Sequence, residues 1–122
     1  MVDPLSGRAN ALLLKLLDGC AARHRALTAN VANADTPGYE RKDVRFRSAL
    51  AEAVRRPGVD AIRSVSIDAE TDPHAAKRAD GNSVCLDTEM AKIAENRLTY
   101  EMSVAVLRRK IAMVRSAITG RP

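Results

Sequence analysis

The sequence predicts a mainly α-helical fold: long N- and C-terminal helices packed as a coiled-coil-like pair, with a short irregular middle segment. Apolar residues recur at helical spacing near both ends of the chain. Between these stretches the spacing fades, and turn-forming Pro-Gly and Asp-Gly pairs appear. The aromatic residues are Phe46, Tyr39 and Tyr100, with no Trp, and such a composition favours helices over sheets.

The N-terminal helix is expected within residues 3–34. Asp3 suits the N-cap and Pro4 the first helical position. Residues 35–38 read Asp-Thr-Pro-Gly and should end the helix near Asn33, because Pro cannot continue the helical ladder and Pro-Gly favours a type II turn. Within the helix, alternating steps of four and three residues predict a seam that packs against other helices: Leu13, Leu17, Cys20, His24, Leu27, Val31 and Ala34. A histidine in this seam is expected to be a packed core residue.

The middle segment, residues 35–83, shows no sustained periodicity. Residues 44–55 could form a short helix with Phe46, Leu50 and Val54 on one face. Val65 and Ile67 alternate with polar neighbours and suggest a short strand. Most of residues 69–79 reads as loop.

The C-terminal helix, residues 87–119, has the clearest pattern. Asp87 is the expected N-cap, Glu89 suits the positive end of the helix dipole, and Gly120 should end the helix. Such a helix would extend about 50 Å at ~1.5 Å per residue, so an elongated shape is expected. Its seam repeats at steps of three and four residues: Met90, Ile93, Arg97, Tyr100, Val104, Leu107, Ile111, Val114 and Ile118.

We expect residues 1–122 to form a single domain in which the two helices cannot cover all of their apolar surface. A helix pair has too little interior for both seams and the residues beside them. The remaining surface is therefore expected to face other subunits, and it includes Leu12, Leu16, Leu98, Met102 and Met113.

Charge and residue chemistry define the alternatives. The net charge of +5 permits a small basic helical module that binds nucleic acid or an acidic protein partner. That alternative lacks the interleaved aromatic residues of a single-strand binder and any helix-turn-helix spacing.

Cys20 and Cys85 belong to no Cys/His cluster, so we expect two small apolar residues and no metal site. No nucleophile motif or phosphate-binding glycine loop is present, so we expect no enzyme activity, no cofactor and no small-molecule substrate. Neither a cleavable signal nor an apolar stretch of about 20 residues is visible, which indicates synthesis as a soluble cytosolic protein.

Two segments resemble the flagellar axial protein family. Residues 29–39, Ala-Asn-Val-Ala-Asn-Ala-Asp-Thr-Pro-Gly-Tyr, resemble the N-terminal signature of flagellar rod, hook and hook-associated proteins. Residues 80–84, Asp-Gly-Asn-Ser-Val, with Asp87, Glu89 and Met90 after them, are similar to the C-terminal motif of the small proximal-rod members. The resemblance implies a subunit-interface motif: Asn30, Asn33, Ala34, Asp35, Thr36, Pro37, Gly38, Tyr39, Asp80, Gly81, Asn82, Val84 and Asp87.

The resemblance also implies a function: a structural subunit of the basal-body rod that assembles helically and transmits motor torque for motility. Its implied partners are copies of itself, other rod proteins, membrane-ring and rod-adaptor proteins at the rod base, and the flagellar type III export apparatus. The implied location is the periplasm-spanning rod of the basal body, reached by export without a cleaved signal.

Overall fold

The chain forms two long antiparallel helices and a compact middle segment. The computed structural model describes residues 7–121. Its elements are α1 (Gly7–Ala32), β1 (Lys42–Asp43), α2 (Arg47–Arg55), α3 (Asp60–Arg63), β2 (Glu70–Thr71) and α4 (Leu86–Thr119). The predicted mainly α-helical fold with a long helix pair is confirmed, while the predicted helix start at Asp3 and Pro4 lies outside the described residues.

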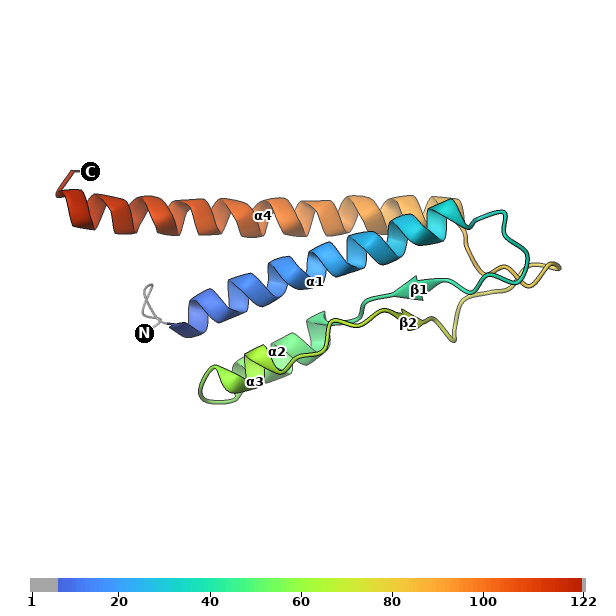
Figure 1. Cartoon of the computed structure of the whole chain (residues 1–122), viewed down its shortest axis with the longest axis horizontal. Coiled ribbons are helices and arrows are strands. Elements are labelled where there is room, and N and C mark those ends of the chain that lie inside the picture. Colours follow the sequence, from blue (N-terminus) through green and yellow to red (C-terminus); the bar gives the residue numbers. More distant parts are fainter. Residues whose placement is uncertain (1–6, 122) are drawn as a thin grey trace.

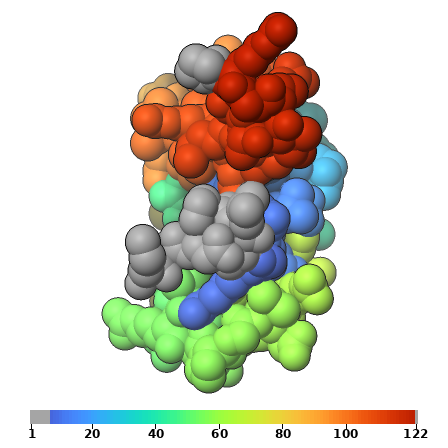
Figure 2. Space-filling model, turned by 90° about the vertical axis from the view of Figure 1, so that its left-hand side faces the viewer, coloured from blue at the N-terminus to red at the C-terminus, as the bar shows by residue number. Residues whose placement is uncertain are grey.

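The elements lie in three layers, with α1 between α4 and the middle segment (Figure 1). The long helices approach each other near the end of α1 and diverge toward the chain termini. An end view shows the same order, with the last turns of α4 above the first turns of α1 and with α2 and α3 below (Figure 2).

The apolar core lies between α1 and the middle segment, not between the two long helices. Phe46, Leu50 and Ile62 supply its largest buried side chains. They pack against a face of α1 that carries Ala11, Ala22 and Ala26, whose small side chains permit close approach. Leu12 and Leu16 are partly buried against this core, so the middle segment covers part of the α1 surface that we expected to be free. That their remaining surface faces other subunits stays a prediction.

Phe46 packs directly on Gly19, and this contact predicts a substitution effect. A Cβ at position 19 would lie 2.7 Å from Cδ2 and Cε2 of the buried Phe46 ring. Gly19→Ala gains about 1 kcal/mol of helix propensity, but overpacking at a buried ring costs about 1–3 kcal/mol. We expect a net loss of about 1 kcal/mol in urea unfolding of the purified protein. Gly7→Ala is the matched control, since a Cβ there meets nothing within 4 Å. Equal stability gains in both variants would contradict this packing.

The middle segment differs from the prediction in three places. The predicted strand at Val65 and Ile67 is wrong, because both side chains pack into or against the core after α3. The strands are instead β1 and β2, which pair antiparallel with Lys42 opposite Thr71 and Asp43 opposite Glu70. Consequently, β2 interrupts the predicted loop over residues 69–79. The helix expected within residues 44–55 is present as α2 and begins at Arg47.

The ends of α4 lie within one residue of the prediction. The helix begins at Leu86 with Cys85 as N-cap, so Asp87 lies in the first turn and its predicted capping role is wrong. Gly120 adopts φ 64° and ends the helix as expected. The two cysteines differ in environment, since Cys20 is buried and Cys85 is exposed. Cys85 therefore does not serve as a packed apolar residue.

The face of α4 that lies against α1 is largely polar. Glu89, Asn96 and Ser103, spaced seven residues apart, are its buried residues. Asn96 Nδ2 donates a hydrogen bond of 2.8 Å to the Cys20 carbonyl of α1. Much of the apolar surface of α4 is therefore left uncovered. Leu98, Met102 and Met113 are more than half exposed, as expected, and so is Val106.

Candidate assembly site

The two motifs found in the sequence meet at a corner where α1 ends and α4 begins. Asn82 is fully buried, and its Nδ2 lies 2.9, 3.0 and 2.8 Å from the carbonyl oxygens of Asn33, Ala34 and Thr36. These three carbonyls belong to the turn that directly follows α1. Asn82, which is distant in sequence, therefore caps the carbonyls of this turn and joins the second motif to the first.

Asn30 connects α1 to β1 in a similar way. Its Nδ2 donates to the Lys42 carbonyl at 2.7 Å, and its Oδ1 accepts from the Lys42 amide at 2.9 Å. This pair of bonds substitutes for a strand neighbour and satisfies both backbone groups of Lys42. Nδ2 also lies 3.1 Å from Glu89 Oε2, and the Tyr39 hydroxyl donates to Oδ1 at 3.3 Å. One buried amide of α1 thus connects this helix to β1 and to α4.

Backbone bonds and two glycines complete the corner. The Gly38 amide donates to the Asp80 carbonyl at 2.9 Å, and the Ser83 amide donates to the Tyr39 carbonyl at 3.0 Å. Gly38 and Gly81 have φ of 75° and 81°. A Cβ on Gly81 would lie only 3.3 Å from the Gly38 Cα. The two turns therefore pack backbone against backbone, which glycine permits.

A buried charged cluster, defined by Arg41, Asp43, Asp72 and Glu89, lies beside this corner. Arg41 Nε donates to the fully buried Glu89 carboxylate, and its Nη1 lies 2.6 Å from Asp72 Oδ2. Arg41 Nη2 lies 3.5 Å from Asp43 Oδ2. The cluster therefore joins β1, the residue after β2 and the first turn of α4 around one guanidinium.

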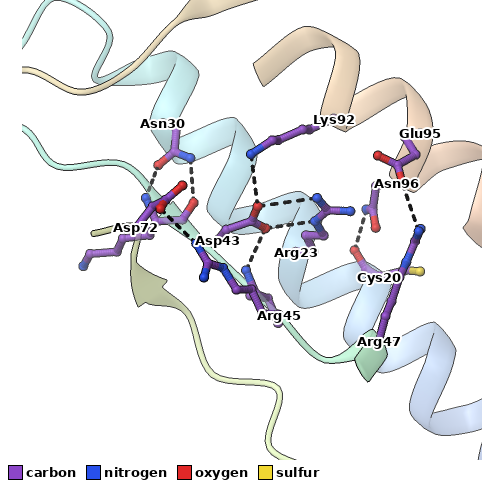
Figure 3. Close-up of polar contacts among 12 residues, drawn as sticks. Cys20, Arg23, Asn30, Asp43, Arg45, Arg47, Asp72, Lys92, Glu95 and Asn96 are labelled. Atoms are coloured by element: carbon purple, nitrogen blue, oxygen red, sulfur yellow. Dashed lines mark hydrogen bonds and ion pairs between the residues drawn. The ribbon is translucent and has the colours of Figure 1, made fainter. Parts of the chain in front are cut away.

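Two further cations, one from each long helix, reach Asp43. Arg23 Nε of α1 lies 2.9 Å from Asp43 Oδ1, and Lys92 Nζ of α4 lies 3.6 Å from Oδ2. Figure 3 shows Arg23 and Lys92 approaching Asp43 from their two helices. With Arg41 and with Arg45, whose Nη2 lies 2.9 Å from Asp72 Oδ1, four cations face the three carboxylates of the cluster.

The pKa values follow this arrangement. Burial alone would raise the pKa of Asp43, but the hydrogen bond and charge of Arg23, the Val44 amide and Lys92 hold it below its ordinary value. Asp72 behaves likewise: the His74 amide, Arg41 and Arg45 outweigh burial and lower its pKa. Burial would lower the pKa of Arg41, but Glu89, Asp72 and Asp43 raise it above its ordinary value. Every one of these groups is therefore held in its charged form.

The residues of the predicted interface motif divide into buried, half-buried and exposed sets. Asn30, Ala34, Asn82 and Val84 are buried and hold the corner together within one chain. Asn33, Tyr39 and Gly81 are half-buried, and the exposed members are Asp35, Thr36, Pro37, Gly38, Asp80 and Asp87. Sequence reasoning missed the charged cluster, because it assigned Glu89 to the helix dipole and considered the basic residues only through the net charge. The seven-residue spacing of Glu89, Asn96 and Ser103 was the available signal.

The predicted seams take part only partly in the contact between the long helices. In α1, Cys20 and Leu27 are buried, but His24 is exposed, so its predicted role as a packed core residue is wrong. In α4, Ile93, Val104, Leu107 and Val114 are half-buried. The other apolar seam residues of α4 are exposed: Met90, Tyr100, Ile111 and Ile118.

The geometry does not favour the nucleic-acid alternative. Several arginines of the middle segment are already paired with carboxylates, since Arg41 is buried among carboxylates, Arg45 pairs with Asp72 at 2.9 Å and Arg47 pairs with Glu95 at 2.9 Å.

Burial raises the pKa of the Cys20 thiol, which disfavours the reactive thiolate. Within residues 7–121, no three His, Cys, Asp or Glu side chains are grouped to hold a metal ion. No helix in that range is both long and apolar enough to span a membrane.

A helix pair closed by a buried polar corner, with extensive apolar surface left uncovered, defines a helical assembly protein. No protein-family model matches the chain. Curated relatives do match: the flagellar basal body rod protein FlgB of Escherichia coli K12 is 35% identical over 105 residues, covering 71% of this chain and 75% of the relative. FlgB of Cereibacter sphaeroides is 35% identical over 130 residues, covering 97% and 95%, and FlgB of Salmonella typhimurium LT2 is 30% identical over 118 residues, covering 82% and 85%. The chain belongs to the FlgB family of flagellar basal body rod proteins.

Proposed function

We propose that this chain is a structural subunit of the proximal flagellar rod, assembling helically with copies of itself and with other rod proteins. Its place in the FlgB family supports a structural role in the basal body. The observation that carries the proposal is the uncovered apolar face of α4, which we call the back stripe: Leu98, Met102, Val106 and Met113. A contiguous apolar stripe on a helix is a surface for association.

The corner suits a subunit that transmits torque. Its buried amides and charged cluster fix the end of α1, β1 and the start of α4 relative to one another. Exposed Asp35, Thr36, Pro37 and Gly38 are then held on a rigid support where they can contact neighbours. Force applied at the contacts of one subunit would pass to the next without local rearrangement.

The remaining parts of the proposal concern the rod base and the route to it. Membrane-ring and rod-adaptor proteins would contact the chain at the rod base, after passage through the flagellar type III export apparatus without a cleaved signal. A core confined to one side of α1 supports this route, because a lone subunit gains part of its stability only when neighbours cover α4.

Replacing Met102 with aspartate tests the role of the back stripe. The Met102 side chain is 62% exposed, so Met102→Asp should change the free energy of unfolding of the isolated chain by no more than about 0.5 kcal/mol. In cells that lack the wild-type gene, we expect this variant to abolish swimming in soft agar and to leave no complete basal bodies by electron microscopy. Met102→Leu, which preserves an apolar side chain, should support normal swimming. Normal motility with Met102→Asp would refute the proposal.

A further inference from the structure

An apolar groove lies between the last turns of α4 and the first turns of α1. It encloses about 410 Å³, and its apolar lining comes from Leu107, Ile111, Val114 and Ile118 of α4, with Asn10 of α1 opposite. The two helices diverge toward the chain termini, where this groove lies (Figure 1). We call it the tail groove.

Two cationic side chains, those of Lys110 and Arg115, line the tail groove. Lys110 lines the groove, and its Nζ is buried without a hydrogen-bond partner among the described residues. A buried ammonium without a partner is costly, because it has lost water and gained no acceptor. Arg115, which is exposed, also lines the groove. The groove therefore suits an occupant that brings a carboxylate together with apolar side chains, and the Lys110 side chain would turn its buried Nζ outward to meet it.

The positive charge of residues 102–121 excludes a contact in which the C-terminal ends of two copies meet. From residue 102 to residue 121 the chain has no Asp or Glu, and its charged residues are Arg108, Arg109, Lys110, Arg115 and Arg121. Two such tails placed together would repel each other. The occupant must carry the opposite charge.

The opposite end of the same molecule has the required chemistry. Leu86 and Met90, one turn apart at the start of α4, are both at least half exposed. Asp87 between them is exposed and forms no ion pair with any residue from 7 to 121. Residues 79–91 contain no Lys or Arg. This end therefore offers two apolar side chains and the carboxylate of Asp87, which forms no ion pair within residues 7–121.

We propose that the tail groove of one copy binds the start of α4 of a second copy, with Asp87 supplying the carboxylate that Lys110 lacks. The contact is heterologous, because the surfaces that meet are different ends of the chain. Such a contact does not close on itself as a symmetric dimer does, so it propagates from copy to copy. It rests on the proposed rod function and specifies one contact through which copies join.

An anionic membrane surface fits the tail less well. A helix that lies on a membrane carries its apolar residues on one face. Around the tail of α4, Leu107 and Val114 line the groove, whereas Met102 and Val106 belong to the separate, exposed back stripe. Apolar residues on two faces suit a helix enclosed by protein on both sides.

Cross-linking between Cys85 and position 119 tests the contact. Cys85 is exposed beside Leu86, and the Thr88 hydrogen bond lowers the pKa of its thiol, whereas Cys20 is buried. Thr119→Cys adds a second thiol at the edge of the groove without changing charge. We expect a short bismaleimide to join Cys85 to position 119 of the next copy in isolated basal bodies, giving dimers and longer ladders. Thr28→Cys, an exposed threonine of α1 near the opposite end, is the matched control and should give only background ladders.

A charge swap tests the role of Lys110. Adding Lys110→Glu to Thr119→Cys should lower the yield of cross-linked dimer about tenfold, and adding Asp87→Lys in the same chain should restore it. The contact is refuted if basal bodies and swimming are intact but position 119 links to itself, to a different rod protein or to nothing. The same holds if the purified protein instead binds phosphatidylglycerol vesicles through Lys110 and Cys85 is never linked. Absence of the chain from basal bodies would refute the rod function as well, so the two failures can be distinguished.

Discussion

Arg41→Met is expected to lower the free energy of unfolding by about 3–5 kcal/mol. Arg41 is buried, and its guanidinium contacts Glu89, Asp72 and Asp43. Methionine fills much of the volume but leaves the fully buried Glu89 side chain, among residues 7–121, with only the Asn30 amide as a hydrogen-bond donor. An uncompensated buried charge is more costly than the loss of an exposed pair. Urea unfolding of the purified variant at pH 7, followed by circular dichroism, would measure the loss.

Arg45→Met is the matched control for Arg41. Arg45 contacts the same Asp72, but its side chain is 55% exposed, so the variant should lose no more than about 1 kcal/mol. The double variant Arg41→Met, Glu89→Leu removes the charge that Arg41 balances, and we expect it to recover part of the stability lost in the single variant. A loss in Arg41→Met no larger than that in Arg45→Met would show that the cluster does not hold the fold together.

Local patterns in the sequence were sufficient to predict the two long helices and the turn that follows the first of them. The Pro37-Gly38 stop and the Gly120 stop each depend on a few neighbouring residues, so both could be located without knowledge of the tertiary structure. The partner of the first motif could not be found in this way. Asn82 lies 46 to 49 residues beyond the carbonyls that it caps, and spacing along the chain contains no record of that contact.

The faces by which the long helices contact each other were harder to predict, because heptad spacing assumes that apolar residues form the contact. Heptad spacing placed Met90, Tyr100 and Ile111 against the partner helix, yet all three are exposed. The chain instead places Glu89, Asn96 and Ser103 against α1, and much of its apolar α4 surface faces outward. A subunit that is completed by its neighbours can use polar side chains to fix the position of its own helices and keep apolar surface for assembly. The pattern of apolar residues alone cannot distinguish these two uses.

Asn82→Asp preserves the shape of the side chain and should nevertheless disrupt the corner. The substitution removes the Nδ2 donor that faces three carbonyl oxygens and places a carboxylate there, in a site with no solvent exposure. We expect a loss of about 3–5 kcal/mol at pH 7, because the introduced charge is buried against acceptors. Protonation of the introduced carboxyl would relieve the repulsion, so its pKa should be raised in the folded state relative to the unfolded state.

The sign of the pH dependence separates this mechanism from a general loss of packing. A carboxyl with a raised pKa binds more protons when folded, so the deficit of the variant relative to wild type should shrink as pH falls from 7 toward about 4. The stability of the wild-type protein itself should fall at acid pH. The folded-state pKa values of Asp43 and Asp72 are lowered, so the stability that these groups contribute is lost as they protonate. Asn33→Asp is the control, since Asn33 is only half-buried and its side chain donates to one carbonyl, that of Ala29. A deficit in Asn82→Asp that is the same at pH 7 and pH 5 would show that the three carbonyls do not set the stability of the corner.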